Sequence, residues 1–183
     1  MEIRLATMAD AEGVKTLLKA NHVSNVPDDQ KKNGFVTTNL TDEQLKHLIE
    51  DEKGVMIAVD DEGRVRGFAL AASWEYWSQW PLFAYMIEIL PQYSLGGVAL
   101  SKENSYQYGP VCVDAELRGT GVFEQLFAAS LASMAPRFPI MATFINHINP
   151  RSYAAHTRKV HTEDLGTFDF NNNHYHLMSC PTK

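Results

Sequence analysis

The chain has 183 residues, of which 45% are hydrophobic and 21% are charged, the balance of an ordinary globular protein. This length is sufficient for one domain with a hydrophobic core, so we expect residues 1–183 to form a single domain. The net charge of −6 argues against nucleic acid and anionic membranes as partners, because both favour a basic protein face.

The sequence predicts a cytoplasmic protein. Residues 1–7 lack the basic and then apolar pattern of a signal peptide, and no stretch approaches the ~18 apolar residues of a membrane helix. Cys112 and Cys180 show no metal-binding spacing. Cys112 lies in an apolar run, which predicts a buried thiol in a reducing compartment.

The expected elements follow from apolar periodicity and from helix and turn signals. Thr41 and Gln44 form a capping-box pattern at the start of a helix, and Asn149 and Pro150 have the same role as cap and first residue of a later helix. The polar segments 21–39 and 91–104 are expected to be loops. We expect strands at 3–5, 55–59, 65–72, 106–113, 140–145, 166–170 and 175–178, and helices opening near residues 9, 41, 121 and 150 and in the later part of 74–90. This order predicts an α/β protein whose mixed sheet carries helices on its faces.

The segment after the strand at 106–113 has the features of a phosphate-binding turn. It is short and polar, with Arg118, Gly119 and Gly121, and an amphipathic helix begins directly after it. Glycine lets the main chain approach a ligand closely, and the first amides of a helix have no internal acceptor and favour an anion. The turn therefore predicts a pyrophosphate site, although it matches neither the P-loop nor the dinucleotide pattern. A glycine-rich turn with a solvated arginine is the alternative.

This stretch resembles motif A of the GCN5-related N-acetyltransferases (the GNAT family), whose signature is Gln/Arg-x-x-Gly-x-Gly/Ala. Arg118 and Gly121 match the signature, whereas Phe123 stands where the family usually has a small residue. The resemblance extends over most of the chain. It implies an α/β (α+β) fold with a twisted, mostly antiparallel sheet of about seven strands and about four helices. It also implies acetyl-CoA as the co-substrate, without a metal.

The resemblance assigns the residues that hold the coenzyme. Residues 118–123 would receive the pyrophosphate on main-chain amides, and the strand ending at Val113 would bind the pantetheine arm. In the family this strand splays from the next one, here 140–145, and the acetyl thioester lies in the gap. The expected coenzyme-binding residues are Cys112, Val113, Arg118, Gly119, Thr120, Gly121, Val122, Phe123, Asn149 and Ser152.

Residues 149–156 resemble a second GNAT motif, with an asparagine at a helix start and a tyrosine seven residues later. Asn149 matches, and His156 stands at the tyrosine position. The family's tyrosine protonates the departing thiolate, which a histidine with a reference pKa of ~6.5 could also do. Ser152, Tyr153 and His156 share one side of the helix by their spacing, so Tyr153 is a second candidate acid. A packed or solvent-facing histidine is the alternative for His156.

The general base is less clearly indicated. An amine must be neutral to attack a thioester, so the site needs a base or a water chain. The strand at 106–113 carries no carboxylate where some family members have a glutamate. Glu75 is the nearest substitute by topology, followed by Glu88, and a solvated acid at a helix start is the alternative for Glu75. After the second motif, Val160-His161 replaces the usual Gly-Phe, and one extra residue precedes Gly166.

Two further clusters have more than one interpretation. Six aromatic residues lie within residues 74–85 and could wall an acceptor pocket, form a dimer contact or belong to the core. We favour a pocket or an interface, because Trp74 and Tyr76 alternate as in a strand. His174 and His176 share one strand face. A metal site would need a third ligand, so we expect surface histidines and no metal.

The leading hypothesis is an acetyl-CoA-dependent N-acetyltransferase that works by direct attack in a ternary complex, with a small-molecule or peptide amine as acceptor. Its expected catalytic residues are His156, Tyr153 and Glu75. A non-catalytic acyl-CoA-binding sensor or scaffold is an open alternative, as is an acyltransferase with a longer acyl chain or an oxygen acceptor. We expect no nucleic-acid or membrane partner and leave a homodimer open.

Overall fold

The computed structural model describes residues 1–33 and 35–183, with side chains for all of these except residues 32 and 33. Contacts divide the chain into two compact units. Unit 1 comprises Met1–Ala71 and Gly109–Ser133, and unit 2 comprises Ala72–Tyr108 and Met134–Lys183. A single domain over residues 1–183 stays a prediction.

Seven strands form the main sheet, as the sequence predicts: β1 (Glu2–Leu5), β2 (Val55–Val59), β3 (Val65–Ser73), β6 (Ser105–Val113), β7 (Ile140–Asn146), β8 (Glu163–Phe170) and β9 (Asn173–Pro181). Strand β6 begins in unit 2 and ends in unit 1. Unit 1 therefore has the order β1-β2-β3-β6, and unit 2 has the order β6-β7-β9-β8. Among the pairs with a described register, β6 and β7 are parallel and the others are antiparallel. The sheet is thus mixed and mostly antiparallel, as expected.

Six α-helices occur among the described residues, where the family resemblance implies about four: α1 (Ala11–Asn21), α2 (Asp42–Glu50), α3 (Trp74–Trp77), α4 (Pro81–Ile89), α5 (Val122–Met134) and α6 (Pro150–Ala154). The chain order predicts five of these helices, including the 5-residue α6, and the one that it misses is α3, which has 4 residues. Helix α6 continues directly into a π-helical segment, Ala155–Lys159. Helix α3 is too short for apolar periodicity to reveal.

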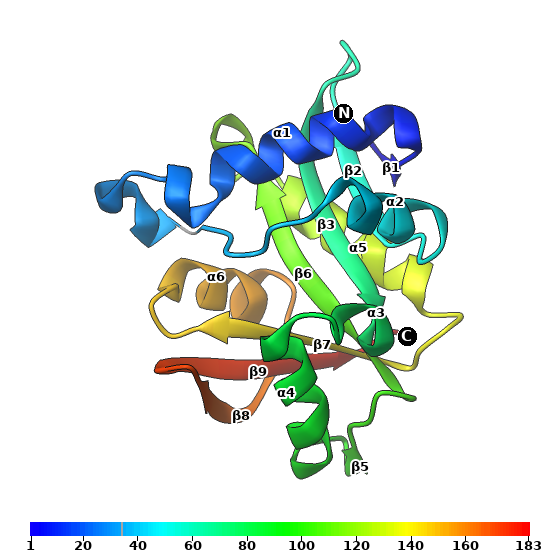
Figure 1. Ribbon diagram of the computed structural model, residues 1–183, viewed down its shortest axis with the longest axis vertical. Helices are drawn as coiled ribbons and strands as arrows, with labels where there is room; N and C mark the ends of the chain where they lie inside the picture. Colours follow the sequence, from blue (N-terminus) through cyan, green and yellow to red (C-terminus); the bar gives the residue numbers. More distant parts are fainter. Residues whose placement is uncertain (34) are drawn as a thin grey trace. The chain divides into compact units, whose positions relative to one another are not determined.

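Unit 1 is a sheet covered by helices whose apolar stripes the sequence predicts. The Thr41 hydroxyl accepts from the Gln44 amide at 3.1 Å, and Gln44 Oε1 accepts from the Thr41 amide at 2.8 Å, so the capping box of α2 is confirmed. Gly63, at φ +81°, lies in the turn between β2 and β3. Figure 1 shows α1 and α2 on one side of β2 and β3, and α5 on the other. The buried helix positions are Ala11, Val14, Leu18, Leu45, Leu48, Ile49, Val122, Leu126, Phe127 and Ser130.

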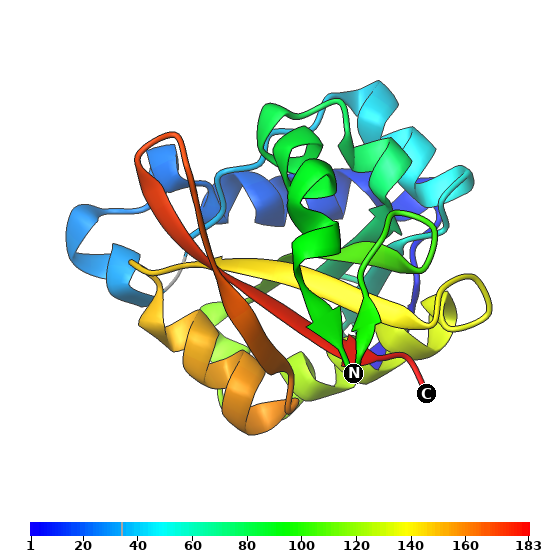
Figure 2. The ribbon, with the colours of Figure 1, turned by 90° about the horizontal axis from the view of Figure 1, so that it is seen from below.

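Unit 2 is built on the hairpin of β8 and β9, which Figure 2 shows as a long twisted ribbon. Asn171 and Asn172 form its two-residue turn with φ of 51° and 64°. Asparagine tolerates this left-handed conformation better than most residues, and the turn type matches the twist of the strands. Strand β9 also pairs along the whole of β7. The predicted turn of asparagines is confirmed.

The aromatic segment of unit 2 belongs mainly to the core. Trp74 and Trp77 are fully buried, and their indole N–H groups donate to Ser105 Oγ at 3.0 Å and to the Gln107 carbonyl at 3.2 Å. The strand-like alternation of Trp74 and Tyr76 is misleading, because both residues lie in α3. The Ser73 hydroxyl caps this helix by accepting from the Tyr76 amide at 3.2 Å. The preference for a pocket or interface is therefore wrong for these tryptophans.

The two predicted loops contain short ordered elements. Residues 91–104 include a small hairpin of β4 (Ser94–Leu95) and β5 (Val98–Ala99). Residues 21–39 contain two 3-10 turns, Val23–Asn25 and Asp28–Asn33, while Gly34 of this segment lies outside the described residues. Among the described residues, no helix combines the length and the apolar character needed to cross a membrane.

Candidate functional site

The turn after β6 in unit 1 has the local structure that the sequence predicts for an anion site. A 3-10 turn, Ala115–Leu117, begins at Asp114, whose Oδ1 accepts from the Glu116 amide at 3.0 Å. Gly119 and Gly121 follow with φ of +78° and +90°, a region that favours glycine over residues with a Cβ. A Cβ at Gly119 would meet nothing within 4 Å, so the conformation of this residue, and not crowding, calls for glycine.

The main-chain amides of this turn divide into two groups. Those of Arg118 and Thr120 donate to carbonyls within the turn, at 3.3 Å and 3.2 Å. Within the part of the chain that the structure describes, the amides of Gly119, Gly121 and Val122 donate to no acceptor. Helix α5 has 13 residues and begins at Val122, so its dipole adds to the attraction for an anion.

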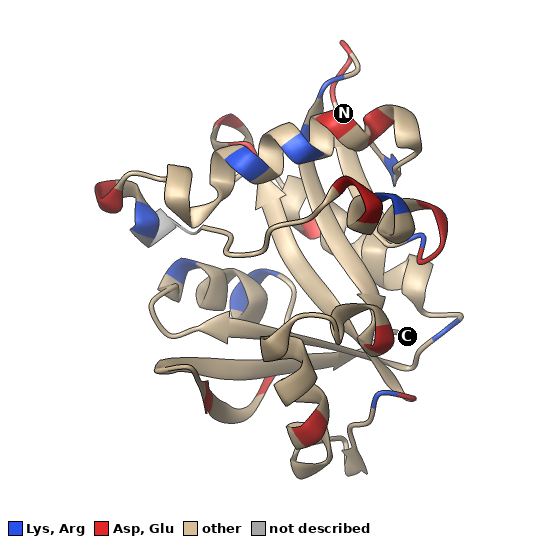
Figure 3. Cartoon of the chain, in the orientation of Figure 1, with Lys and Arg blue, Asp and Glu red and all other residues tan. Residues whose placement is uncertain are grey.

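Some side chains of the turn bond within the turn, and one of them has no partner among the residues that the structure describes. The Thr120 hydroxyl donates to the Leu117 carbonyl, which makes it part of the turn's internal bonding. Arg118 is partly exposed and forms no side-chain ion pair or hydrogen bond with any described residue. An unpaired guanidinium next to three open amides suits a phosphate group. Asp114 and Glu116 bring negative charge to the same turn, and the β2–β3 hairpin also carries residues of both signs (Figure 3).

Cys112 and the end of the β6–β7 ladder belong to different units. In unit 1, Cys112 is buried, and burial raises the pKa of its thiol to about 12. This thiol stays protonated near neutral pH, which argues against a covalent role.

In unit 2, β6 and β7 pair only from Ser105–Ile140 to Gln107–Ala142. The Thr143 hydroxyl then donates to the Tyr108 carbonyl at 2.7 Å in place of a ladder bond.

Helix α6 in unit 2 begins as the sequence predicts. The side-chain oxygen of Asn149 accepts from the Ser152 amide at 3.3 Å, and Pro150 is the first helical residue. Because the oxygen of Asn149 is used in this cap, its side-chain amide is the group with which it would donate to a ligand. The Ser152 hydroxyl lies 3.3 Å from His156 Nδ1. Ser152 therefore orients His156, in addition to its expected place near the coenzyme.

His156 is held as a neutral imidazole. Its Nδ1 lies 2.8 Å from the Ser152 carbonyl, which can only accept, so Nδ1 carries the proton and Nε2 carries the lone pair. Only 3% of the residue is exposed, and this burial lowers the pKa of His156 below its usual 6.5. At neutral pH His156 is thus neutral, and Nε2 is the atom at which it could accept a proton. To act as an acid, His156 would first have to gain a proton.

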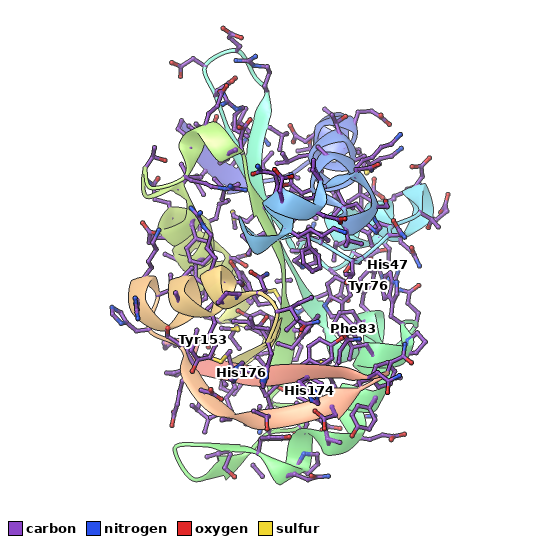
Figure 4. All side chains as sticks on the ribbon, turned by 90° about the vertical axis from the view of Figure 1, so that its left-hand side faces the viewer. His47, Tyr76, Phe83, Tyr153, His174 and His176 are labelled. Atoms are coloured by element: carbon purple, nitrogen blue, oxygen red, sulfur yellow. The ribbon has the colours of Figure 1, made fainter. Side chains whose placement is uncertain are left out.

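The Tyr153 hydroxyl is engaged by a carboxylate. It donates to Asp164 Oδ2 at 2.9 Å, and this hydrogen bond is the main reason that the pKa of Tyr153 is raised. The Tyr153 ring lies 4.4 Å from the His176 ring, and His176 Nδ1 lies 2.9 Å from the same Asp164 oxygen. Figure 4 shows Tyr153 of α6 beside His176, with His174 further along β9. This arrangement favours a structural role for Tyr153 over that of an acid.

Comparisons with solved structures identify the fold. An N-acetyltransferase from Staphylococcus aureus Mu50 is 18% identical, with a TM-score of 0.64 and coverage of 100% of this chain and 98% of that one. Ard1 from Thermoplasma volcanium is 14% identical, with a TM-score of 0.64 and coverage of 98% and 96%. The GNAT family N-acetyltransferase YhbS from Escherichia coli, solved in complex with CoA, is 17% identical, with a TM-score of 0.53 and coverage of 100% and 81%. This chain has the GNAT fold. No family model matches the sequence, and neither does any curated protein.

Within this GNAT fold, the departures after the second motif have a structural counterpart. Residues 155–159 form a π-helical segment, a conformation that accommodates one extra residue and is often found at functional sites. His161 follows with φ +57°. The amide and hydroxyl of Thr162 both donate to the His156 carbonyl, each at 2.8 Å. The turn that follows His156 is therefore anchored on the His156 carbonyl.

Glu75 has the surroundings of a solvated helix-start acid. It is the exposed residue of α3, between the buried Trp74 and Tyr76, and lies in the first turn, where a carboxylate stabilises the helix dipole. Its role as a base stays a prediction.

Among the described residues, no group of three histidine, cysteine or acidic side chains could hold a metal. His174 pairs with Asp169 through Nδ1, and the rings of His147 and His176 lie 4.1 Å apart.

Sequence reasoning missed the residues that support the candidate site from a distance. Asp164 binds Tyr153 from 11 residues away, and Arg66 binds Asp114 and Glu116 from 48 and 50 residues away. Neither Asp164 nor Arg66 lies in a short motif. The charges alone gave a weak signal, because Asp114 and Glu116 place two acids beside a turn expected to bind a phosphate.

Proposed function

We propose that this chain is a GNAT-family N-acetyltransferase that transfers the acetyl group of acetyl-CoA to a primary amine of a small molecule or peptide. One observation carries the proposal: three unpaired amides, those of Gly119, Gly121 and Val122, lie with the unpaired Arg118 at the start of α5. The similarity in fold to named N-acetyltransferases, one of them solved with CoA, supports it.

The residues of the turn fit the diphosphate of coenzyme A. The three amides and the Arg118 guanidinium would each donate to phosphate oxygens. Thr120 would act on the ligand only indirectly, since its amide and hydroxyl bond within the turn. The resemblance to the second GNAT motif also implies a coenzyme contact for Asn149 of unit 2, which would donate through its side-chain amide. Acetyl-CoA would supply the activated acetyl group as a thioester.

The reaction forms a C–N bond, breaks a C–S bond and moves one proton from nitrogen to sulfur. We assign the proton-accepting role to His156, whose Nε2 carries a lone pair while Nδ1 is fixed on the Ser152 carbonyl. Once protonated, the same imidazole can return the proton to the thiolate. Cys112 would not form an acetyl-enzyme, because its pKa of about 12 keeps the thiol protonated. This supports direct attack by the amine.

The test is calorimetric titration with CoA, followed by assay of free thiol released from acetyl-CoA with a panel of amines. The panel should pair small primary amines with peptides that have a free N-terminus or a lysine. We expect CoA to bind and at least one amine class to release thiol above the amine-free background. Binding without release by any amine would favour the acyl-CoA-binding module, and a failure of CoA to bind would overturn the proposal. Propionyl- and succinyl-CoA measure the acyl-chain preference.

A further inference from the structure

Arg66, on β3 of unit 1, binds three carboxylates. Its Nε donates to Asp114 Oδ2 at 3.0 Å, its Nη2 to Glu116 Oε2 at 2.8 Å and its Nη1 to Asp60 Oδ2 at 3.4 Å. Its side chain is only 15% exposed, so its contacts with Asp60 and Asp114 are better shielded from water than an ordinary surface pair, whereas the Glu116 side chain is 82% exposed. Two of the three carboxylates belong to the turn that leads to Gly119 and Gly121.

The main chain fixes the same turn from β3. The Asp114 amide donates to the Arg66 carbonyl at 2.8 Å. The two oxygens of the Asp114 side chain then have separate tasks: Oδ1 accepts from the Glu116 amide and shapes the 3-10 turn, while Oδ2 binds Arg66. The start of the phosphate turn is thus held in place by one residue of the neighbouring strand.

The charges of this turn pose a problem for an anionic ligand. Asp114 and Glu116 precede Arg118 by four and two residues, so these three side chains alone sum to a charge of −1. Like charges brought close together disfavour binding, and the cost rises as water is excluded. Arg66 adds one positive charge next to both acids, although it also binds Asp60, and so reduces the negative field that opposes the open amides.

We propose that Arg66 is a positioning residue of the diphosphate site. It holds Asp114 and Glu116 so that the turn presents the amides of Gly119 and Gly121, and it reduces the repulsion of these two acids for the ligand. This inference rests on the proposed function, because it assumes that the turn binds the diphosphate of coenzyme A.

Arg64 provides a matched control on the same hairpin. It binds Asp60 at 3.0 Å and Glu62 at 3.1 Å, and its side chain is 63% exposed. Among the described residues, it forms no ion pair with Asp114 or Glu116. Arg64→Gln and Arg66→Gln therefore remove the same charge from the same region, and only Arg66→Gln releases the acids of the phosphate turn.

The experiment compares both variants with the wild-type protein, by calorimetry with CoA and by kinetics with two acetyl donors. Acetyl-CoA contains the diphosphate, and S-acetylpantetheine lacks it. We expect Arg66→Gln to raise the Kd for CoA and the KM for acetyl-CoA about 10-fold, the effect of one lost charge-assisted contact. Its kcat at saturation and its kcat/KM with S-acetylpantetheine should match the wild type, and Arg64→Gln should match it throughout.

Two further variants separate charge from position. Arg66→Lys keeps the charge but loses the planar fork, so it should recover only part of the affinity for CoA. In Arg66→Gln/Glu116→Gln one unopposed acid is gone, and the affinity should rise above that of Arg66→Gln. If Arg66→Gln fails to fold, Arg66→Lys carries the test, with an expected Kd about 3-fold above wild type.

The outcomes distinguish this inference from the proposed function. A wild-type protein that does not bind CoA overturns both. If wild type binds CoA and the Arg66 variants bind it within about 2-fold of wild type, only the role of Arg66 is overturned. An equal loss of activity with S-acetylpantetheine would also overturn it, because general damage to the fold would then explain the defect.

Discussion

The turn after β6 and the helix α6 differ in how they present polar groups. The turn uses main-chain amides, those of Gly119, Gly121 and Val122, and leaves them without an acceptor among the described residues. Helix α6 uses side chains, and these bond to its own main chain or to a more distant strand: Asn149 to the Ser152 amide, His156 to the Ser152 carbonyl, and Tyr153 to Asp164. One region is open to a ligand, and the other is fixed by its own contacts.

The difference explains why the two regions match the GNAT motifs unequally. A site made of main-chain amides needs only the right dihedral angles, so two glycines and an arginine preserve it. A site made of side chains depends on partners from other elements, and these partners change together with it. The replacement of tyrosine by His156 accompanies a π-helical segment and a Thr162 bound to the His156 carbonyl. The turn therefore keeps the residue pattern of the first GNAT motif, whereas α6 departs from the pattern of the second.

The largest effect should come from His156→Asn, which tests whether α6 is chemically active. Asparagine can keep the hydrogen bond to the Ser152 carbonyl but removes the proton-accepting Nε2. We expect kcat to fall between about 10² and 10⁴-fold with little change in the KM for acetyl-CoA. His161→Asn is the matched control, because His161 is exposed and its φ of +57° suits asparagine. Steady-state thiol release measures both, and equal turnover by the two variants would leave His156 with a packing role only.

Gly121→Asp tests the open turn and should have the next largest effect. At φ +90° the new side chain strains the main chain, and its charge meets the expected phosphate. We expect the Kd for CoA to rise about 100-fold, or about 2.7 kcal/mol. Gly63→Asp makes the same substitution at φ +81° with nothing within 4 Å, so it reproduces the strain and the charge away from the turn. Calorimetry should show an unchanged Kd for Gly63→Asp. If both variants lost a similar amount of affinity for CoA, the turn would not be the binding site.

Local signals in the sequence were sufficient for the parts of the molecule that depend on neighbouring residues. The capping box of Thr41 and Gln44, the cap by Asn149 and the turn of asparagines at 171 and 172 are all confirmed. Each involves residues close together in the chain, and each has a specific backbone requirement. The positive φ angles of Gly119 and Gly121 were predictable for the same reason, whereas the contacts of this turn with Arg66 were not.

The features that sequence reasoning missed depend on distant partners. Helix α3 is decided by the Ser73 cap and by indole bonds to Ser105 and Gln107, 31 and 30 residues away, so the alternation of Trp74 and Tyr76 gave the wrong element. The tautomer of His156 follows from a local bond, but its burial follows from the packing of unit 2. Periodicity reports which face of an element is apolar, and it does not report which side chains from other elements meet there.

Tyr153→Phe asks whether α6 contains a second acid, and we expect a small effect. Because the hydroxyl already donates to Asp164, its loss should lower the free energy of unfolding by about 1 kcal/mol and change kcat less than about 3-fold. Tyr93→Phe is the control, since the Tyr93 hydroxyl donates to the Thr167 carbonyl at 2.8 Å, also in unit 2. Denaturant titration and thiol release apply to both. If turnover dropped by about two orders of magnitude for Tyr153→Phe alone, Tyr153 would be the acid and the assignment would be reversed.

The smallest effect concerns the pH dependence of stability, which reports whether His156 is neutral in the folded protein. Burial lowers the pKa of His156 in the folded state below the 6.5 of an exposed imidazole. Between these two values the unfolded chain binds more protons, so acidification through about pH 6.5 favours unfolding. Each unit of difference in pKa contributes about 1.4 kcal/mol. Wild type should therefore lose more stability than His156→Asn between about pH 7.5 and roughly pH 5.5, a range chosen around that reference value.

Other groups titrate over the same range, so the informative quantity is the difference between the two proteins at each pH. Urea titrations at several pH values give this difference, and the variant cancels the contributions common to both. If the free energies of unfolding of wild type and His156→Asn changed in parallel with pH, His156 would gain its proton as easily in the folded protein as in the unfolded chain. The imidazole would then be available as an acid at neutral pH, and the contrast between an open turn and an internally fixed helix would no longer hold at its central residue.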